Sequence, residues 1–489
     1  MQDVASGLAA RVLPGLAAVL AVPLLVQILG AQQYAAIGIF LTVQTLATLL
    51  DVGLSTSISR QAAWLMGSNA AQREFGGLLH SFEIPNLATA ALILLAGALV
   101  GRAILSAAFH IAPETIGLDY TGIFFLFAGI GVRFPFWLYF GYLSGRRYIQ
   151  TANYIFLVAE IARIFGSLAL MIWVAPKLSL FFAWNFFTGL IATVAAAIAV
   201  YRITSPARVP PNWRGLMEIR GVLFGNGQML FLFAIASSFD KFFLPWFVSA
   251  ADYGIYVAIG QLAIGNFVFI YPVWTAFHPR LLAAIAANNT RSIQQTFLSA
   301  AGVMTGLCCA FMVGTMVATP AILHLWIGPR ETGFDLVLIL VAAGYGLLAV
   351  SHLALTIHQA AGRYFPTALI FAGAIVIVPV AGYLTLQRID VNAVAALWML
   401  VYAIEFLAGA FAFRLYAPRL LPLWIVYVVV PLFVATFAGG LLSHWTHGLT
   451  MSAQLTVAVC CAALTALAVA ITNPAIRHWV LYHLASEPQ

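Results

Sequence analysis

Charged side chains are scarce in this chain of 489 residues: only 8% are Asp, Glu, Lys or Arg, whereas 63% are hydrophobic. A soluble domain carries about 25% charged residues. The composition therefore excludes an ordinary soluble domain and predicts an integral membrane protein, for which we expect no nucleic-acid partner.

Cysteine is also scarce. The four cysteines form two adjacent doublets, Cys308–Cys309 and Cys460–Cys461, inside apolar runs. Neighbouring cysteines on a helix are poorly placed to bridge, and no CxxC or Cys/His spacing indicates a metal. P-loop, HExxH and paired-carboxylate motifs are missing too, so we expect no metal, no cofactor and no catalytic residue.

The N-terminus lacks the ordered basic, apolar and cleavage regions of a signal peptide, so we expect the first span to be retained.

Lysine is almost absent from the basic residues, with twenty arginines against Lys177 and Lys241. A bias in codon composition would explain this excess. Alternatively, the substrate carries phosphate, which the rigid guanidinium fork binds in a bidentate manner.

Long apolar runs are what the chain has in abundance. About 20 apolar residues cross the hydrocarbon core as a helix, so the sequence predicts an all-α polytopic membrane protein with about fourteen transmembrane helices. The expected spans are 8–29, 35–57, 85–109, 120–143, 150–174, 178–201, 222–247, 253–276, 296–319, 334–357, 365–386, 391–413, 421–441 and 451–473.

The distribution of basic residues between the loops predicts the orientation. Fifteen arginines lie at the termini and in the even-numbered loops, against four bases on the other side, Arg102, Lys177, Arg330 and Arg388. By the positive-inside rule both termini are cytoplasmic. We expect the longest non-helical stretches, about 60–84 and 201–220, on the cytoplasmic side, and no loop has room for a folded domain.

The chain also repeats itself weakly. "ILGAQQYAAIGIF" at 28–40 resembles "FVSAADYGIYVAI" at 247–259, an offset of 219, and "SGRRYIQTA" at 144–152 resembles "AAGRYFPTA" at 360–368, an offset of 216. Each copy holds six helices, so the two copies share one membrane orientation, and a site is expected near the midplane between them.

The repeat predicts a domain organisation of two lobes related by a parallel pseudo-twofold axis. We expect an N-terminal six-helix lobe at 1–203, a cytoplasmic linker at 204–219, a second six-helix lobe at 220–416 and two additional helices within 417–489.

Three segments resemble a known family. "PLLVQILGAQQYAAIGIFLTVQTLATLLDVGLS" at 23–55, "ADYGIY" at 251–256 and "HQAAGRY" at 358–364 are similar to bacterial polysaccharide flippases of the Wzx type, in the MOP superfamily that also holds MATE exporters and the MurJ lipid II flippase. The resemblance implies a MATE-like fold in the bacterial inner membrane. It also implies flipping of an undecaprenyl-pyrophosphate-linked oligosaccharide to the outer leaflet, for O-antigen, lipopolysaccharide or other polysaccharide biosynthesis. Other polysaccharide-assembly proteins would then be partners.

Charges inside the spans are the candidate site residues, because each costs roughly 2.5–3.5 kcal/mol to insert. At the repeat offsets Arg133, Glu160, Arg163, Asp240, Lys241 and Glu405 all match apolar residues or glycine in the other copy, which indicates a role beyond topology. We expect Arg133 and Lys241 to face the cavity, with Arg11, Arg133, Arg163 and Lys241 binding the substrate. Asp240, Glu160, Glu405 and Asp51 would balance charge or couple transport to a proton or sodium ion.

Structural alternatives stay open for several of these residues. Glu160 and Arg163 lie three apart and can simply pair along one helix. Arg11 fits a positive-inside anchor, and Asp51 can pair with a nearby base. Adjacent residues on a helix point about 100° apart, so we expect that Asp240 and Lys241 do not satisfy each other. Both could instead snorkel toward the outer surface.

Two other functions compete with a flippase. A MATE-like multidrug antiporter would share the fold, although such exporters typically have twelve helices. A membrane glycan polymerase or ligase would need a sizeable outer loop, which the sequence lacks, so a non-enzyme is expected.

Overall fold

The computed structural model describes residues 2–47, 54–67, 72–213, 238–328, 333–361, 365–386 and 388–477, together with 217 and 235. These residues are helical with short connections, and no strand occurs among them. The long α-helices are α1 (Gln2–Leu29), α2 (Ala31–Ala47), α3 (Leu54–Gly67), α4 (Gln72–Phe109), α5 (Tyr120–Gly145), α6 (Ile149–Trp173), α7 (Leu178–Ala199), α10 (Ala250–Ala286), α11 (Thr290–Val317), α13 (Asp335–Ala361), α14 (Phe365–Thr385), α15 (Val391–Tyr416), α17 (Val430–Thr446) and α18 (Met451–Thr472).

Shorter helical pieces connect them: η2 (Val200–Thr204), η3 (Leu244–Trp246), α12 (Thr319–Trp326), η4 (Pro418–Leu420), α16 (Leu421–Trp424) and η5 (Ile425–Val429).

The fourteen predicted spans agree with these helices wherever the chain is described. Among the described residues, eleven helices are long and apolar enough to cross a membrane, and α14 contains a shorter apolar helix. The predicted span 35–57 runs through α2 into the start of α3, across residues 48–53, which lie outside the described part. Most of the predicted span 222–247 also lies outside it. The chain is therefore an all-helical, multi-pass membrane protein.

One loop prediction was wrong. The segment expected to be non-helical, 60–84, is occupied by α3 and by the first turns of α4, with only 68–71 outside the described residues. Hydropathy marks where a helix leaves the hydrocarbon core, but a polar sequence that forms helix well can continue beyond it. The second segment, expected to be non-helical over 201–220, is irregular from Ser205 to Asn212, but its first residues belong to η2 and residues 213 and 217 are helical, so this prediction holds only in part. The irregular part packs on α4, where Nδ1 of His80 lies 2.8 Å from the carbonyl oxygen of Val209.

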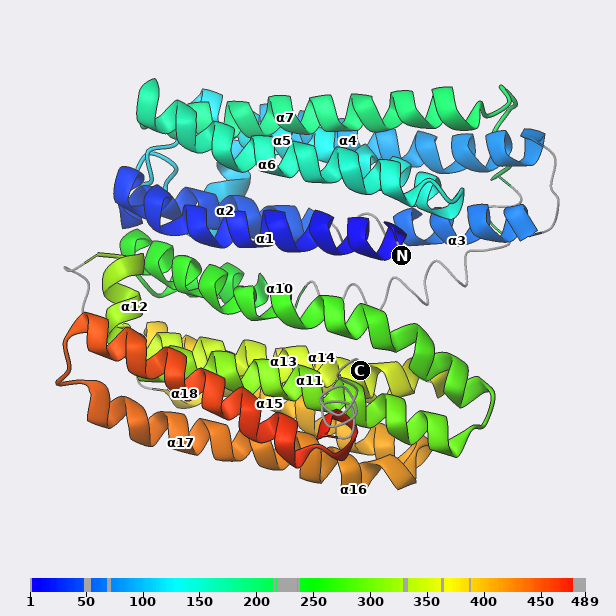
Figure 1. The fold of residues 1–489 in the computed structure, drawn as a ribbon. Coiled ribbons are helices and arrows are strands. Elements are labelled where there is room, and N and C mark those ends of the chain that lie inside the picture. The colour runs from blue at the N-terminus through cyan, green and yellow to red at the C-terminus, as the bar shows by residue number, and fades with distance from the viewer. Residues whose placement is uncertain are drawn as a thin grey trace, which may run out of the picture. The chain divides into compact units, whose positions relative to one another are not determined.

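The chain divides into two compact units, Met1–Val257 and Ala258–Gln489, so the division falls within α10. In each unit the long helices lie side by side along a common direction (Figure 1). Since packing rather than the repeat defines these units, the lobes 1–203 and 220–416 stay a prediction.

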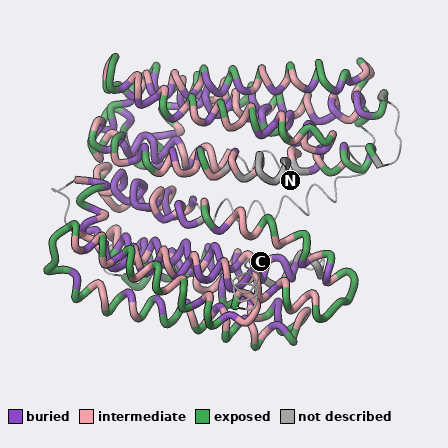
Figure 2. The backbone as a smooth tube through the Cα atoms, in the orientation of Figure 1, coloured by how far each residue is buried: buried purple, intermediate pink, exposed green. Residues whose placement is uncertain are grey.

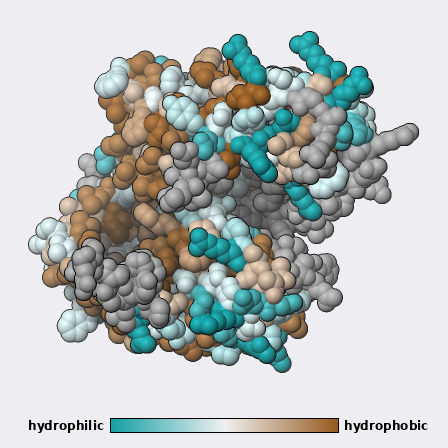
Figure 3. Space-filling view, turned by 45° about the vertical axis from the view of Figure 1, so that its right-hand side comes forward, coloured by the Kyte–Doolittle hydropathy of each residue, from teal (hydrophilic) through white to brown (hydrophobic). Residues whose placement is uncertain are grey.

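Burial is uneven among the helices. Buried residues make up 72% of the most apolar window of α5 in the first unit and 78% of that of α13 in the second, but only 11% of that of α18 (Figure 2). Large apolar side chains are exposed on many outer helices, for example Leu99, Trp173 and Trp445. Hydrophobic residues cover broad areas of the surface, while hydrophilic ones gather in separate groups (Figure 3). This pattern is the one expected where lipid surrounds the outer helices.

Helix boundaries recur at the offsets of the sequence repeat. The starts of α2 and α10 are 219 residues apart, which is the offset between the first pair of matched segments, and the ends of α3 and α10 are the same distance apart. The starts of α6 and α14 are separated by the offset of the second pair. The weak sequence matches therefore correspond to equivalent helices.

The best-matched repeated segments meet within the first unit. A Cβ atom added at Gly38 of α2 would lie 2.8 Å from Cγ2 of Val257, and one added at Gly254 would lie 2.0 Å from the carbonyl oxygen of Ala31. α2 and the first turns of α10 thus approach so closely that Gly254 leaves no room for a side chain.

Candidate functional site

Three of the predicted charges form one cluster in the first unit. Glu160 of α6 is buried, and its carboxylate accepts hydrogen bonds from Arg133 of α5 and from Arg163 one turn further along α6. Nη2 of Arg163 lies 2.7 Å and Nε lies 2.9 Å from the same oxygen, Oε2 of Glu160. The expected pairing of Glu160 with Arg163 is confirmed, but Arg133, which has no acid on its own helix, finds one on the neighbouring helix.

α7 completes this cluster with small and polar residues. Arg163 also donates to Oδ1 of Asn185 at 3.2 Å. A Cβ atom on Gly189 would lie 2.7 Å from Cγ of Arg133, so only a residue without a side chain leaves room for the arginine here. The repeat had pointed to position 189, because Glu405 is its counterpart, but nothing in the sequence indicated this steric role.

The cluster carries an excess of positive charge. Two guanidinium groups face one carboxylate, with side chains that are 12%, 19% and 9% exposed for Arg133, Arg163 and Glu160. The cavity beside them measures about 10 Å³, which is at the lower limit for a single water molecule. A phosphate group does not fit into this cavity.

Asp240 and Lys241 form a second cluster in the first unit. Nζ of Lys241 lies 3.2 Å from both carboxylate oxygens of Asp240, and the hydroxyl of Tyr256 donates to Oδ2 of Asp240 at 2.8 Å. The expectation that these neighbours do not satisfy each other was wrong, because the long lysine stem bends its ammonium group back to the adjacent carboxylate. Their side chains are 3% and 5% exposed, which excludes the snorkelling alternative in this structure. The expected partner from another helix is present, namely Tyr256 of α10.

Glu405 is on α15 in the second unit. Its carboxyl group is within hydrogen-bonding reach of Ser351 on α13. Within the described part of the chain, Oε2 of Glu405 is buried without a hydrogen-bond partner. A buried carboxyl group with one oxygen left without a partner is suited to binding a proton or a cation.

Two predicted site residues are not tested by the geometry. The backbone of Arg11 lies in α1, but its side chain is outside the described residues, as is the whole of Asp51. The substrate-binding and coupling roles of all eight predicted site residues stay predictions.

The sequence analysis missed an aromatic group in the second unit, formed by α10 and α13. Nε1 of Trp274 donates to Oγ1 of Thr356 at 3.1 Å, and Nδ1 of His278 lies 3.1 Å from the same hydroxyl. The ring of Trp274 lies 4.7 Å from that of His278 and 5.2 Å from that of His352, between centroids. The spacing of four between Trp274 and His278 was a signal, since it places both on one helix face.

No family model matches the chain, and no curated protein matches its sequence. Several solved structures share its fold. An inward-facing multidrug resistance MATE family transporter of the MOP superfamily is 15% identical with a TM-score of 0.67, over 86% of this chain and 94% of its own. The lipid II flippase MurJ in an inward closed conformation is 14% identical with a TM-score of 0.64, over 94% of this chain and 97% of its own. A MOP superfamily transporter from Pyrococcus furiosus is 16% identical with a TM-score of 0.61, over 84% of this chain and 95% of its own.

These likenesses define the fold class. The chain has the fold shared by MATE transporters and MurJ, and the structures it resembles are transporters or flippases. The expected MATE-like architecture is therefore confirmed.

Proposed function

We propose that this protein is a flippase that moves an undecaprenyl-pyrophosphate-linked oligosaccharide from the cytoplasmic to the outer leaflet by alternating access, for cell-surface polysaccharide synthesis. Its place would be the bacterial inner membrane, with both termini in the cytoplasm. The observation that carries the proposal is the extent of the likeness to the lipid II flippase.

That likeness extends into the C-terminal helices. The match to MurJ covers 94% of this chain, and the part that it leaves unmatched is shorter than the segment from Val430 to Thr472, which holds α17 and α18. The match must therefore enter α17 or α18. The match to the MATE transporter covers 86% of the chain. The unmatched remainder is longer than the segment from Val430 to Thr472, so this match could omit α17 and α18 altogether. A fold extended beyond twelve helices favours a flippase over a drug exporter.

The charge of the first unit supports an anionic cargo. Arg133 and Arg163 outnumber the single carboxylate of Glu160, and an excess positive charge among membrane helices attracts a pyrophosphate in a medium where screening is weak. In the structure both arginines are held by Glu160. During transport one of them would exchange that carboxylate for the phosphate, which can also accept two parallel hydrogen bonds from a guanidinium group.

The aromatic group of the second unit suits the sugar part of such a cargo. Trp274 supplies a half-buried indole ring, while Thr356, His278 and His352 supply hydrogen-bonding groups around it. An amphipathic aromatic side chain with polar neighbours can contact both the carbon face and the hydroxyl groups of a sugar ring.

A MATE-like exporter of cationic compounds is the second candidate, and Glu405 favours it. A buried carboxyl oxygen without a partner among the described residues could bind a cation or exchange it for a proton or sodium ion.

Reconstitution of the full-length protein in vesicles would separate the two functions. We expect outward movement of an undecaprenyl-pyrophosphate oligosaccharide, measured by access of a membrane-impermeant lectin to the sugar. Arg163→Gln should reduce this movement at least tenfold, because it removes the excess charge but leaves Arg133 paired with Glu160. Arg102→Gln is the matched control, since Arg102 forms an exposed pair with Glu114, and it should leave the rate unchanged.

The exporter would give the opposite pattern. In that case the wild-type protein would transport ethidium but not the oligosaccharide lipid, and Glu405→Gln would lose the ethidium transport. This result would contradict the flippase and support the second candidate.

A further inference from the structure

A cavity of the second unit is lined by none of the charges discussed so far. It has a volume of about 450 Å³ and opens where the turn between α10 and α11 faces the connection from α15 to η4. This is within the range of about 300–1,000 Å³ typical of small-molecule sites. Nothing in the proposed transport cycle uses it.

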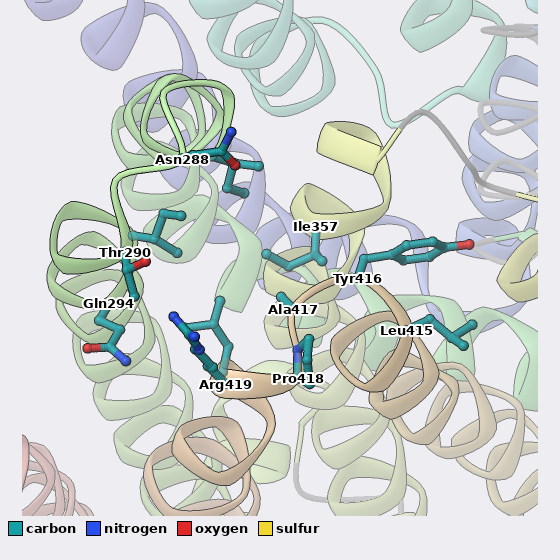
Figure 4. A pocket seen from close by; sticks show the side chains of 12 residues that line it. Asn288, Thr290, Gln294, Ile357, Leu415, Tyr416, Ala417, Pro418 and Arg419 are labelled. Carbon is teal, nitrogen blue, oxygen red and sulfur yellow. The ribbon is translucent and has the colours of Figure 1, made fainter.

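The walls of this cavity are divided into an apolar and a polar part. Ile293, Ile357 and Leu420 contribute the apolar surface, and the last two are each only 2% exposed. Asn288 and Gln294 contribute amide groups, and the exposed Arg419 contributes a guanidinium group. In Figure 4 the side chain of Arg419 extends from the connection after α15 toward the side of Thr290 and Gln294 on α11. A ligand for this site must therefore be amphiphilic.

Arg419 is a free cation among the described residues. None of the ion pairs found in the described ranges includes it. The cavity also borders Thr290, the first residue of the 28-residue helix α11, and the N-terminal end of a long helix adds positive potential. The polar part of the ligand is therefore an anion, and the guanidinium fork favours a phosphate.

The position along the chain indicates the membrane level. α15 is a candidate membrane span that ends at Tyr416, three residues before Arg419. The charge thus lies where a span leaves the hydrocarbon core, at the depth of lipid phosphates, while Ile293 and Ile357 lie on helices that continue into the core.

We propose that this cavity binds an anionic phospholipid, with the phosphate on Arg419 and the first part of one acyl chain against Ile293 and Ile357. A free phosphate would leave the apolar wall unused, and a purely apolar lipid would leave Arg419 unused. The proposal holds whatever cargo the protein transports. The bound lipid would fill the junction at which the C-terminal helices α16 to α18 join the rest of the unit.

Native mass spectrometry of the full-length protein, released from detergent with added phosphatidylglycerol, tests this site. The wild-type protein should retain phosphatidylglycerol, and Arg419→Gln should lower the affinity about tenfold or more, the loss expected for a charge-assisted hydrogen bond. Ile293→Trp should lower it as well, because the indole fills the apolar part while Arg419 remains. Arg414→Gln is the matched control: Arg414 is also exposed and lies in the last turn of α15, but it does not line the cavity.

Three results would overturn the proposal. One is a wild-type protein that retains no phosphatidylglycerol. The second is an equal loss in Arg414→Gln and Arg419→Gln, which would indicate general attraction by surface charge. The third is displacement of the lipid by inorganic phosphate with full retention by Ile293→Trp, which would indicate a free-anion site. Arg419→Gln should melt at the wild-type temperature, since Arg419 is exposed and in no described ion pair.

Discussion

Single residues in this protein show that a buried charge is defined by its neighbours rather than by its own helix. Arg133 has no acid on α5, yet it is bound by Glu160 of α6. Lys241 bends back to Asp240, which also holds Tyr256 from α10. The sequence could identify all four charges as unusual, because inserting each is costly. It could not identify the cross-helix partners, because no local spacing encodes which helices become neighbours.

At the residue scale, Glu160→Gln should destabilise the protein. The change leaves two guanidinium groups close together without a carboxylate, and breaking a buried ion pair in this way costs about 3–5 kcal/mol. We expect lower abundance in the membrane and a lower melting temperature in detergent.

Glu114→Gln is the control for that change. The pair of Glu114 with Arg102 is 55% and 48% exposed, and exposed pairs contribute about 0–1 kcal/mol. If the two variants had the same melting temperature, the ion pairs around Glu160 would not stabilise the protein. Replacing Arg133, Glu160 and Arg163 together by Met should recover much of the stability, while abolishing the proposed transport.

Single helices were largely predictable from hydropathy, because the bilayer fixes their length. The spans predicted at 120–143, 150–174 and 451–473 differ from α5, α6 and α18 by only a few residues at their ends. The prediction failed beyond the membrane core, where α3 and the first turns of α4 continue as helix and where α12 follows α11. Outside the hydrocarbon, hydrophobicity no longer separates helix from loop, so only helix-forming tendency and packing decide.

At the element scale, the close contact of α2 with α10 should depend on Gly254. Leu at this position would place its Cβ 2.0 Å from the carbonyl oxygen of Ala31, which is backbone and can yield only if the helices separate. Overpacking typically costs about 1–3 kcal/mol, so Gly254→Leu should lower the melting temperature and transport.

Gly440→Leu is the matched control for this contact. A Cβ atom on Gly440 of α17 meets nothing within 4 Å, and replacing glycine within a helix favours the helix by up to about 1 kcal/mol. This variant should be as stable as the wild type or more so. Equal stability of both variants would show that the helices separate at no cost.

The whole molecule combines similar helices with dissimilar charges. By the offset of 216, Glu405 in the second unit corresponds to Gly189 in the first, where the glycine makes room for Arg133. One copy therefore holds an excess of base near this position, and the other holds a lone acid. A duplicated fold does not require such a difference, so we infer that it reflects function. An anionic cargo would be attracted to the first copy, while Glu405 would be available to a proton or a cation.

The final prediction concerns the orientation of the whole chain, which helix packing alone does not determine. Fifteen arginines against four bases predict that both termini and the turn between α10 and α11 are cytoplasmic. Green fluorescent protein fused after Gln489 should therefore fluoresce, because it folds in the cytoplasm. Alkaline phosphatase fused after Gly448, between α17 and α18, should be active, because it matures in the periplasm. The same phosphatase fused after Asn288 should be inactive at equal abundance. The reverse pattern at all three positions would show that the protein has the opposite orientation in the membrane. Arg419 would then contact phospholipids of the outer rather than the cytoplasmic leaflet.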